Sequence, residues 1–206
     1  MHVADVTMAA PLPGTVSDER LGVRLLERRA ALDKFLAGVQ RRAFRIAQLS
    51  VRNRDDALDI VQDAMLNLAR GYAQAPAQEW PPIFFRILQN RIRDHQRRGA
   101  VRRRVMAFFS GSGAQDDDAD DVLAAVPGPA TDGPEQRSAL NDAMGALEAA
   151  LHALPGRQRE AFLLRTVEGL DVAATATAMG CTEGSVKTHY SRAVHSLRST
   201  LGEHWP

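Results

Sequence analysis

The sequence predicts an all-α protein in which a flexible acidic linker joins two small helical domains, the second with a helix-turn-helix. Apolar residues recur at helical spacing in almost every segment, whereas the alternating runs of β-branched and aromatic residues that are typical of strands do not occur. The 206 residues suffice for two domains of roughly 70 to 90 residues each. A stretch rich in Gly, Pro and Asp, from Ser110 to Pro134, has the composition of a linker.

The chain is therefore expected to divide into four parts. These are an N-terminal tail over residues 1–24, a first domain over 25–107, the linker over 108–136 and a second domain over 137–204. Charge is uneven although the net charge is only +1: residues 83–104 hold eight Arg and one acid, and residues 115–135 hold seven acids and no base. This asymmetry indicates a basic binding face followed by an acidic tether. Nearly all basic residues are Arg, which suits phosphate binding but equally fits a compositional bias of the genome.

Several kinds of site are not expected. The single Cys181 excludes an internal disulfide and a Cys-based zinc site, and its place in a turn favours core packing over redox chemistry. His189, His195 and His204 do not combine with nearby carboxylates or thiols into a metal site. Because no nucleophile beside a base and no Gly-rich phosphate loop is present, we expect neither an enzyme nor a cofactor. Lacking an apolar run of about 20 residues and a signal layout, the chain is expected in the cytoplasm without membrane insertion.

The first domain contains an amphipathic helix with an acidic outer face. Its apolar positions are Ala57, Val61, Ala64, Met65 and Leu68. Its polar positions are Asp55, Asp56, Asp59, Gln62 and Asp63. Such a face is either solvated or contacts a basic protein surface. A Pro-containing loop follows and leads into a basic helix over residues 83–98, in which Phe84 and Phe85 are expected in the core.

The second domain begins with two helices whose ends are marked in the sequence. Apolar residues at steps of three and four predict a helix over residues 140–154, and Pro155 ends it. A second helix is expected over 156–168, with Gly169 as a left-handed residue after its C-terminus.

A helix-turn-helix is expected next. Asp171 is placed to cap a short helix over 172–179, Gly180 follows it, and Thr182 is placed to cap a longer helix. In this motif the second helix enters the major groove of DNA.

The longer helix has one packing side and one side with hydrogen-bond donors. The packing side consists of Val186, Tyr190, Ala193, Leu197 and Leu201. The donor side consists of Lys187, Thr188, Ser191, Arg192 and His195. Arg192 is suited to grip a guanine edge, Lys187 to contact phosphate or guanine, and the hydroxyl groups to contact either.

These features resemble a known family. The run over residues 151–201, which contains LPGRQRE and SVKTHYSRAVHSL, resembles the C-terminal promoter-binding domain of sigma-70 family transcription factors. That resemblance implies that the longer helix reads the −35 element. The run departs from the family where two acids and Ile are usual, because Ala173, Ala174 and Thr175 stand there.

The first domain resembles the same family. The pattern of Asp59, Gln62 and Asp63 is similar to the sigma helix that docks on the β′ clamp helices of RNA polymerase. The positions of Ile83, Ile87, Asn90 and Asp94 resemble the signature of the helix that recognises the −10 element and captures a flipped base, with Ile83 in place of Trp. By this resemblance Trp80 stacks on a base and Asn90 bonds a base edge. The expected phosphate contacts are Arg86, Arg93, Arg97 and Arg98.

Both modules together resemble the reduced two-domain layout of extracytoplasmic-function (ECF) sigma factors. This implies core RNA polymerase, through its β′ clamp helices and β flap, and promoter DNA as partners, and allows an anti-sigma factor as a third. The alternatives are a stand-alone helix-turn-helix regulator, which leaves the first module unexplained, and an enzyme such as a DNA recombinase, for which no catalytic constellation is seen.

Overall fold

The computed structural model describes residues 15–51, 53–110 and 134–202 of the chain. Within these ranges the protein is all-helical and contains no strand, as the sequence predicts. The first half comprises α1 (Thr15–Val51), α2 (Arg54–Gly71), the short 3-10 helix η1 (Ala77–Glu79) and α3 (Trp80–Ser110). The second half comprises α4 (Pro134–Ala153), α5 (Gly156–Phe162), the π-helical turn η2 (Leu163–Val167), α6 (Val172–Met179) and α7 (Glu183–Leu201).

The core of the first half lies where α1, α2 and α3 pack together. The C-terminal part of α1 turns a stripe of buried residues toward the other two helices, beginning at Leu32 and continuing through Val39 and Ile46. Phe35 of α1 contacts Trp80 and Phe84 of α3, with both pairs of ring centroids 6.0 Å apart. Such tilted and edge-to-face pairs stabilise a helix junction beyond the apolar area they bury. Phe84 and the adjacent residue of α3, Phe85, are fully buried, which confirms their expected place in the core.

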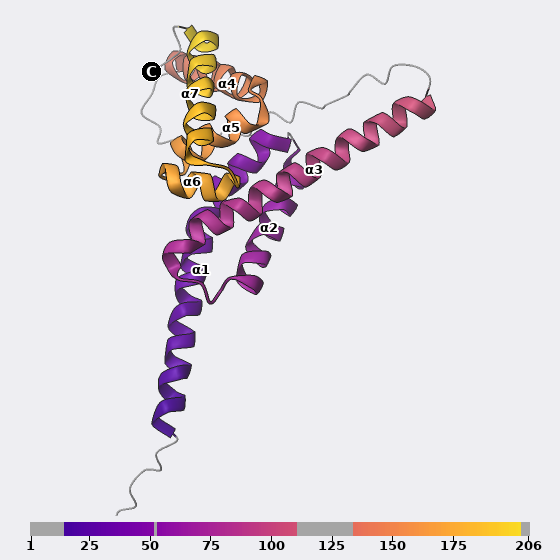
Figure 1. Ribbon diagram of the computed structural model, residues 1–206. Coiled ribbons are helices and arrows are strands. Elements are labelled where there is room, and N and C mark those ends of the chain that lie inside the picture. The colour runs from indigo at the N-terminus through magenta and orange to yellow at the C-terminus, as the bar shows by residue number, and fades with distance from the viewer. Residues whose placement is uncertain (1–14, 52, 111–133, 203–206) are drawn as a thin grey trace, which may run out of the picture.

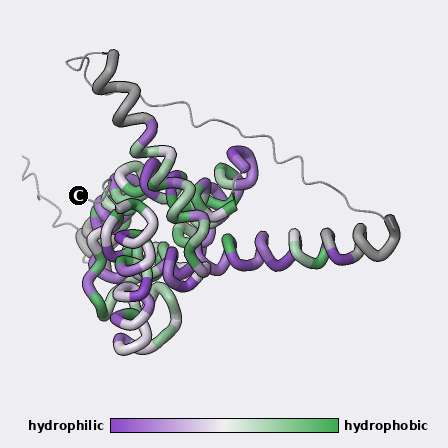
Figure 2. The backbone as a smooth tube through the Cα atoms, turned by 90° about the horizontal axis from the view of Figure 1, so that it is seen from above, coloured by the Kyte–Doolittle hydropathy of each residue, from purple (hydrophilic) through white to green (hydrophobic). Residues whose placement is uncertain are grey.

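Two helices run beyond this core. The first turns of α1 project away from the other helices (Figure 1), and the distal part of α3 extends outward with mostly hydrophilic residues (Figure 2). α1 starts at Thr15, inside the expected tail, and α3 continues to Ser110, past the expected domain end. The expected domain boundaries at residues 24 and 107 therefore fall inside helices, because boundaries drawn from composition and charge do not mark where a helix ends. Most of the expected linker, residues 111–133, lies outside the described residues.

The helices of the second half end close to the predicted residues. α4 ends at Ala153, Pro155 precedes α5, and Gly169 has the left-handed φ of 66°. The helix expected over 156–168 is interrupted by η2, where the N–H of Glu168 bonds to the carbonyl of Leu163 five residues earlier at 3.2 Å. Such a π turn inserts one extra residue into the helix and rotates the residues after it.

The two halves are in contact rather than separate. α6 packs across α3 near the centre of the molecule (Figure 1). The buried apolar residues of both halves belong to one continuous cluster.

Candidate nucleic-acid and protein interfaces

The helix-turn-helix of α6 and α7 is built by local capping. The side chain of Asp171 accepts a hydrogen bond from the N–H of Ala174 at 2.7 Å, and the side chain of Thr182 accepts one from the N–H of Ser185 at 3.2 Å. Gly180 between them has φ 63° and ψ 44°, the left-handed conformation that L residues avoid. Each of these three predictions from the sequence is confirmed.

One side of α7 anchors it in the second half. Val186, Ala193, Leu197 and Leu201 are buried, as the predicted packing side requires. Tyr190 is partly buried and stacks on Phe162, with ring centroids 6.2 Å apart and an interplanar angle of 16°.

The opposite side of α7 is open to solvent. The five predicted contact residues, Lys187, Thr188, Ser191, Arg192 and His195, are all exposed. The hydroxyl group of Thr188 donates to the carbonyl of Gly184 at 3.0 Å, whereas the other four have no hydrogen bond or ion pair to the described residues. The helix thus presents donors that have no partner among the described residues, which is what base-edge and phosphate contacts require.

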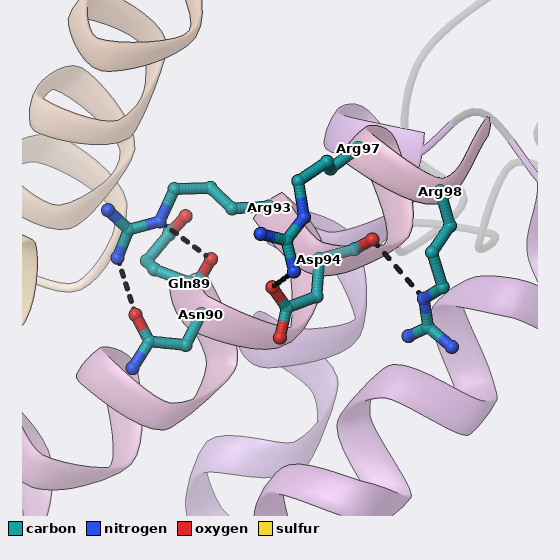
Figure 3. A network of polar contacts seen from close by, with 6 residues as sticks. All are labelled: Gln89, Asn90, Arg93, Asp94, Arg97 and Arg98. Carbon is teal, nitrogen blue, oxygen red and sulfur yellow. Dashed lines mark hydrogen bonds and ion pairs between the residues drawn. The ribbon is translucent and has the colours of Figure 1, made fainter. Parts of the chain in front are cut away.

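The predicted −10 residues lie along α3, where four of them, Asn90, Arg93, Arg97 and Arg98, have local hydrogen bonds or ion pairs (Figure 3). Arg93 donates to the side-chain oxygen of Asn90 at 2.6 Å and to the carbonyl of Gln89 at 3.2 Å. Asp94 pairs with Arg97 at 3.3 Å.

The remaining arginines of this group lie on the surface of α3. Arg98 donates to the carbonyl of Asp94 at 3.3 Å, and Arg86 is exposed with no partner among the described residues. Arg86, Arg97 and Arg98 are thus the exposed arginines of the predicted −10 set, and are called the cationic lane below.

Trp80 is placed differently from the expectation. Its side chain is only 3% exposed, and its indole N–H donates to the carbonyl of Tyr72 at 3.2 Å. In this arrangement the ring has no free face on which a base could stack. The correction follows from packing, because a large apolar ring at the start of α3 stabilises the core when it covers Phe35.

The acidic face of α2 has two kinds of residue. Asp59 and Gln62 are exposed with no partner among the described residues. Asp63 pairs with Arg91 at 3.7 Å and Asp56 with His95 at 3.5 Å, so these two acids bind α2 to α3. The free polar positions on α2 are therefore fewer than the sequence indicated.

Two exposed apolar residues on the same face were not predicted as contact residues from the sequence. Leu58 and Leu66 are 46% and 42% exposed, on either side of Gln62. Their spacing of four residues from Gln62 is visible in the sequence and places all three on one stripe. These two side chains provide apolar area that a bound protein would bury.

The segment where the chain departs from the sigma-70 pattern forms a regular part of α6. Ala173 is exposed, and Thr175 is fully buried with its hydroxyl group donating to the carbonyl of Asp171 at 2.6 Å.

Cys181 packs against the core, and burial raises the pKa of its thiol. Among the described residues no cluster of His, Cys, Asp and Glu could hold a metal ion. No helix in the described ranges is long and apolar enough to cross a membrane.

Two buried carboxylates lie at the junction of the halves. Burial raises the pKa of Glu160, while the charges of Arg157 and Arg93 oppose that rise. Burial also raises the pKa of Glu168, which accepts a hydrogen bond from Arg42 of α1 at 3.0 Å. Both carboxylates therefore interact with arginines of the first half: Glu168 by a hydrogen bond from Arg42, and Glu160 through the charge of Arg93.

Comparison with known proteins covers both modules. Residues 144–197 match the family described as Sigma-70, region 4. The chain is 30% identical over 188 residues to the ECF RNA polymerase sigma factor SigM of Mycobacterium tuberculosis, covering 89% of this chain and 84% of that protein. It is 33% identical over 171 residues to the ECF RNA polymerase sigma factor EcfG of Rhodopseudomonas palustris, covering 82% and 83%.

Solved structures show the same fold. The sigma factor RpoE from Bartonella quintana, in complex with the anti-sigma factor NepR, matches with a TM-score of 0.58 and 23% identity over 82% of this chain and 95% of that one. CnrH in complex with the cytosolic domain of CnrY matches with a TM-score of 0.53 and 17% identity, covering 88% and 96%. Because the relatives extend over both helical halves, a helix-turn-helix regulator with an unrelated first domain is not favoured. The chain belongs to the ECF RNA polymerase sigma factors of the sigma-70 family, and is a transcription initiation factor.

Proposed function

We propose that this sigma factor directs core RNA polymerase to promoters through three separate surfaces. The exposed side of α7 reads the −35 element, the basic side of α3 binds the −10 element, and the outer face of α2 docks on the β′ clamp helices. We assign the polymerase and −10 module to α1, α2 and α3, and the −35 module to α4 through α7. It acts in the cytoplasm, where polymerase and chromosome are.

The observation that carries the proposal is the division of α7 into two sides. Buried apolar residues hold the helix against α4 and α5, while Lys187, Ser191 and Arg192 are exposed and have no partner in the part of the chain that the structure describes. Arginine and lysine whose donors are unused in the free protein form contacts to bases and phosphates at little internal cost. This is the arrangement expected of a recognition helix.

The α3 surface supports a different mode of binding. Arg86, Arg97 and Arg98 suit a strand backbone, and Asn90 suits a base edge once its bond to Arg93 is exchanged. Since Trp80 is buried, we assign base binding to Asn90 and the cationic lane, and a structural role to Trp80.

The α2 surface supports docking on a protein. Asp59 and Gln62 supply polar contacts and the flanking Leu58 and Leu66 supply apolar area, a mixture that is typical of a protein interface. We further propose that the β flap contacts the second half. We also propose regulation by an anti-sigma protein, because RpoE was solved in complex with the anti-sigma factor NepR and CnrH in complex with the cytosolic domain of CnrY.

Run-off transcription with purified core polymerase tests the proposal. We expect promoter-specific transcripts only when both proteins are present, and weak, salt-sensitive binding of duplex promoter DNA by the free protein. Tight footprinting by the free protein, with no gain from core polymerase, would support a stand-alone regulator instead.

A further inference from the structure

The side of α3 that carries the −10 residues continues beyond the core with further arginines. Residues at steps of three, four or seven positions lie on one side of a helix. In the proximal part of α3 this side contains Arg86 and Asn90, to which −10 binding is assigned. In the distal part it contains Arg97, Val101 and Arg104, all of them exposed. The segment over residues 99–104 is called the distal arm below.

Positive charge on the distal arm is not neutralised by the part of the chain that the structure describes. Arg102 and Arg104 are exposed and have no hydrogen bond or ion pair to the described residues. No acid follows Asp94 up to the end of α3, and Asp94 itself pairs with Arg97 at 3.3 Å. Like charges four residues apart, as at Arg98 and Arg102, repel each other along a helix. Binding of an anionic ligand removes that repulsion.

The composition of the distal arm suits a nucleic acid better than a protein. The arm extends outward from the rest of the protein (Figure 1, Figure 2). Among the described side chains of α3, Val101 is the only large apolar one that is exposed, whereas the docking face of α2 has Leu58 and Leu66. The arm therefore offers little of the apolar area that a protein contact buries. It offers arginine instead, whose fork of N–H donors fits a phosphate group.

The length of α3 beyond Asn90 fits a short stretch of duplex DNA. Arg104 follows Asn90 by fourteen residues, which is a rise of about 21 Å at about 1.5 Å per residue. The same length of duplex contains about six base pairs at about 3.4 Å each. Because the chain after α3 continues into the module assigned to the −35 element, we place the arm on the −35 side of the −10 element.

We propose that the distal arm is a further DNA contact, in which Arg102 and Arg104 bind backbone phosphates of the duplex that adjoins the −10 element on its −35 side. The contact is independent of base sequence, because an arginine bound to phosphate reads no base. It anchors the edge at which the duplex passes into the single strand bound at Asn90. The position of that edge rests on the proposed function, whereas binding of duplex phosphates by the arm does not.

Two DNA probes separate the arm from −10 binding. The first is a single-stranded −10 oligonucleotide, and the second carries in addition about eight base pairs of duplex of arbitrary sequence on the −35 side, slightly more than the length of the arm. Fluorescence anisotropy of each labelled probe measures its affinity for the holoenzyme, assembled from core polymerase and the full chain. Wild type should bind the second probe more tightly than the first, and a change in the sequence of the duplex should not alter this gain.

The double variant Arg102→Ala/Arg104→Ala should lose the gain on the second probe and keep the wild-type affinity for the single strand. Loss of two phosphate contacts lowers the slope of log affinity against log salt by about 1.8, since each contact to duplex DNA contributes about 0.9. Between about 50 and 200 mM salt, wild type should therefore lose about twelvefold more affinity for the second probe than the double variant loses. Because Ala favours the helix, circular dichroism should show unchanged helix content.

Two further variants control for net charge and for the kind of contact. Arg24→Ala/Arg29→Ala removes the same charge from the projecting part of α1, where both arginines are exposed without a partner among the described residues, and should behave like wild type. Arg102→Lys/Arg104→Lys keeps both charges on the arm and should retain the wild-type salt slope, because Lys also neutralises phosphate.

An equal gain on the second probe in wild type and in Arg102→Ala/Arg104→Ala overturns the proposal, and is the outcome expected if the acidic stretch Asp116–Asp121 of the chain itself occupies the arm. An equal loss of affinity for both probes also overturns it, because the two arginines then belong to the −10 strand. If wild type fails to bind the single-stranded −10 oligonucleotide, the −10 assignment of α3 is wrong. The arm is then decided by the salt slopes of the free full chain, wild type against the double variant, on plain duplex DNA.

Discussion

Reversing the charge of Asp59 should weaken binding to core RNA polymerase while leaving the fold intact. Asp59 and Gln62 are exposed on α2 and bond to no described residue, in contrast to Asp63 and Asp56, which pair with arginine and histidine on α3. Substitutions at such surface positions change the free energy of unfolding by no more than about 0.5 kcal/mol. A larger loss of polymerase affinity must therefore come from a lost contact with the polymerase and not from unfolding of the sigma factor.

The magnitude follows from the kind of contact that is lost. A hydrogen bond to a charged group contributes about 1.5–3 kcal/mol, so Asp59→Arg should weaken polymerase affinity by roughly 10- to 150-fold. A neutral hydrogen bond contributes about 0.5–1.5 kcal/mol, so Gln62→Ala should weaken it by roughly 2- to 10-fold.

Titration of the labelled sigma factor with core polymerase, followed by fluorescence anisotropy, measures both affinities. Asp33→Arg provides a matched control, because Asp33 is exposed on α1, has no partner among the described residues and undergoes the same charge change. Thermal melts by circular dichroism should be alike for all variants. Unchanged affinity for Asp59→Arg and Gln62→Ala, or an equal loss for Asp33→Arg, would refute docking through this face.

Three further predictions concern the second half. Arg192→Ala should cost about 1–3 kcal/mol at one −35 position, whereas Lys187→Ala should weaken all promoters evenly and flatten the salt dependence; promoter libraries at several salt concentrations distinguish the two, and an unaltered −35 preference for Arg192→Ala would contradict the assigned side of α7. Gly180→Ala should destabilise the protein by about 1–2 kcal/mol through its positive φ alone, because nothing lies within 4 Å of an added Cβ; urea unfolding measures this, and a neutral result would show that the turn relaxes. Burial raises the pKa of Glu160 above 4.5, so its contribution favours the folded state below that pH and is lost as the pH rises through the raised pKa. Glu160→Gln should therefore gain stability relative to wild type between acidic and neutral pH. Urea unfolding at several pH values measures this, and a constant difference between the two proteins would exclude the titration.

The helix-turn-helix could be predicted from the sequence almost residue by residue. Asp171, Gly180 and Thr182 act through bonds to backbone groups within a few positions, and these depend on little beyond the local chain. The two sides of α7 follow in the same way from helical periodicity. The family resemblance is confirmed by comparison with known proteins, while the roles of individual residues stay predictions.

What the tertiary structure alone decided involves residues far apart in the chain. Trp80 has the same indole ring whether it stacks on a base or covers Phe35, and only the packing of α1 on α3 places it inside. The bond between Arg42 and Glu168 spans 126 positions, which no local pattern encodes. Local capping and periodicity determined the helices and their sides, because those interactions close within a turn. The partners of each exposed charge depended on which helices meet, and that is settled by the burial of apolar surface across the whole chain.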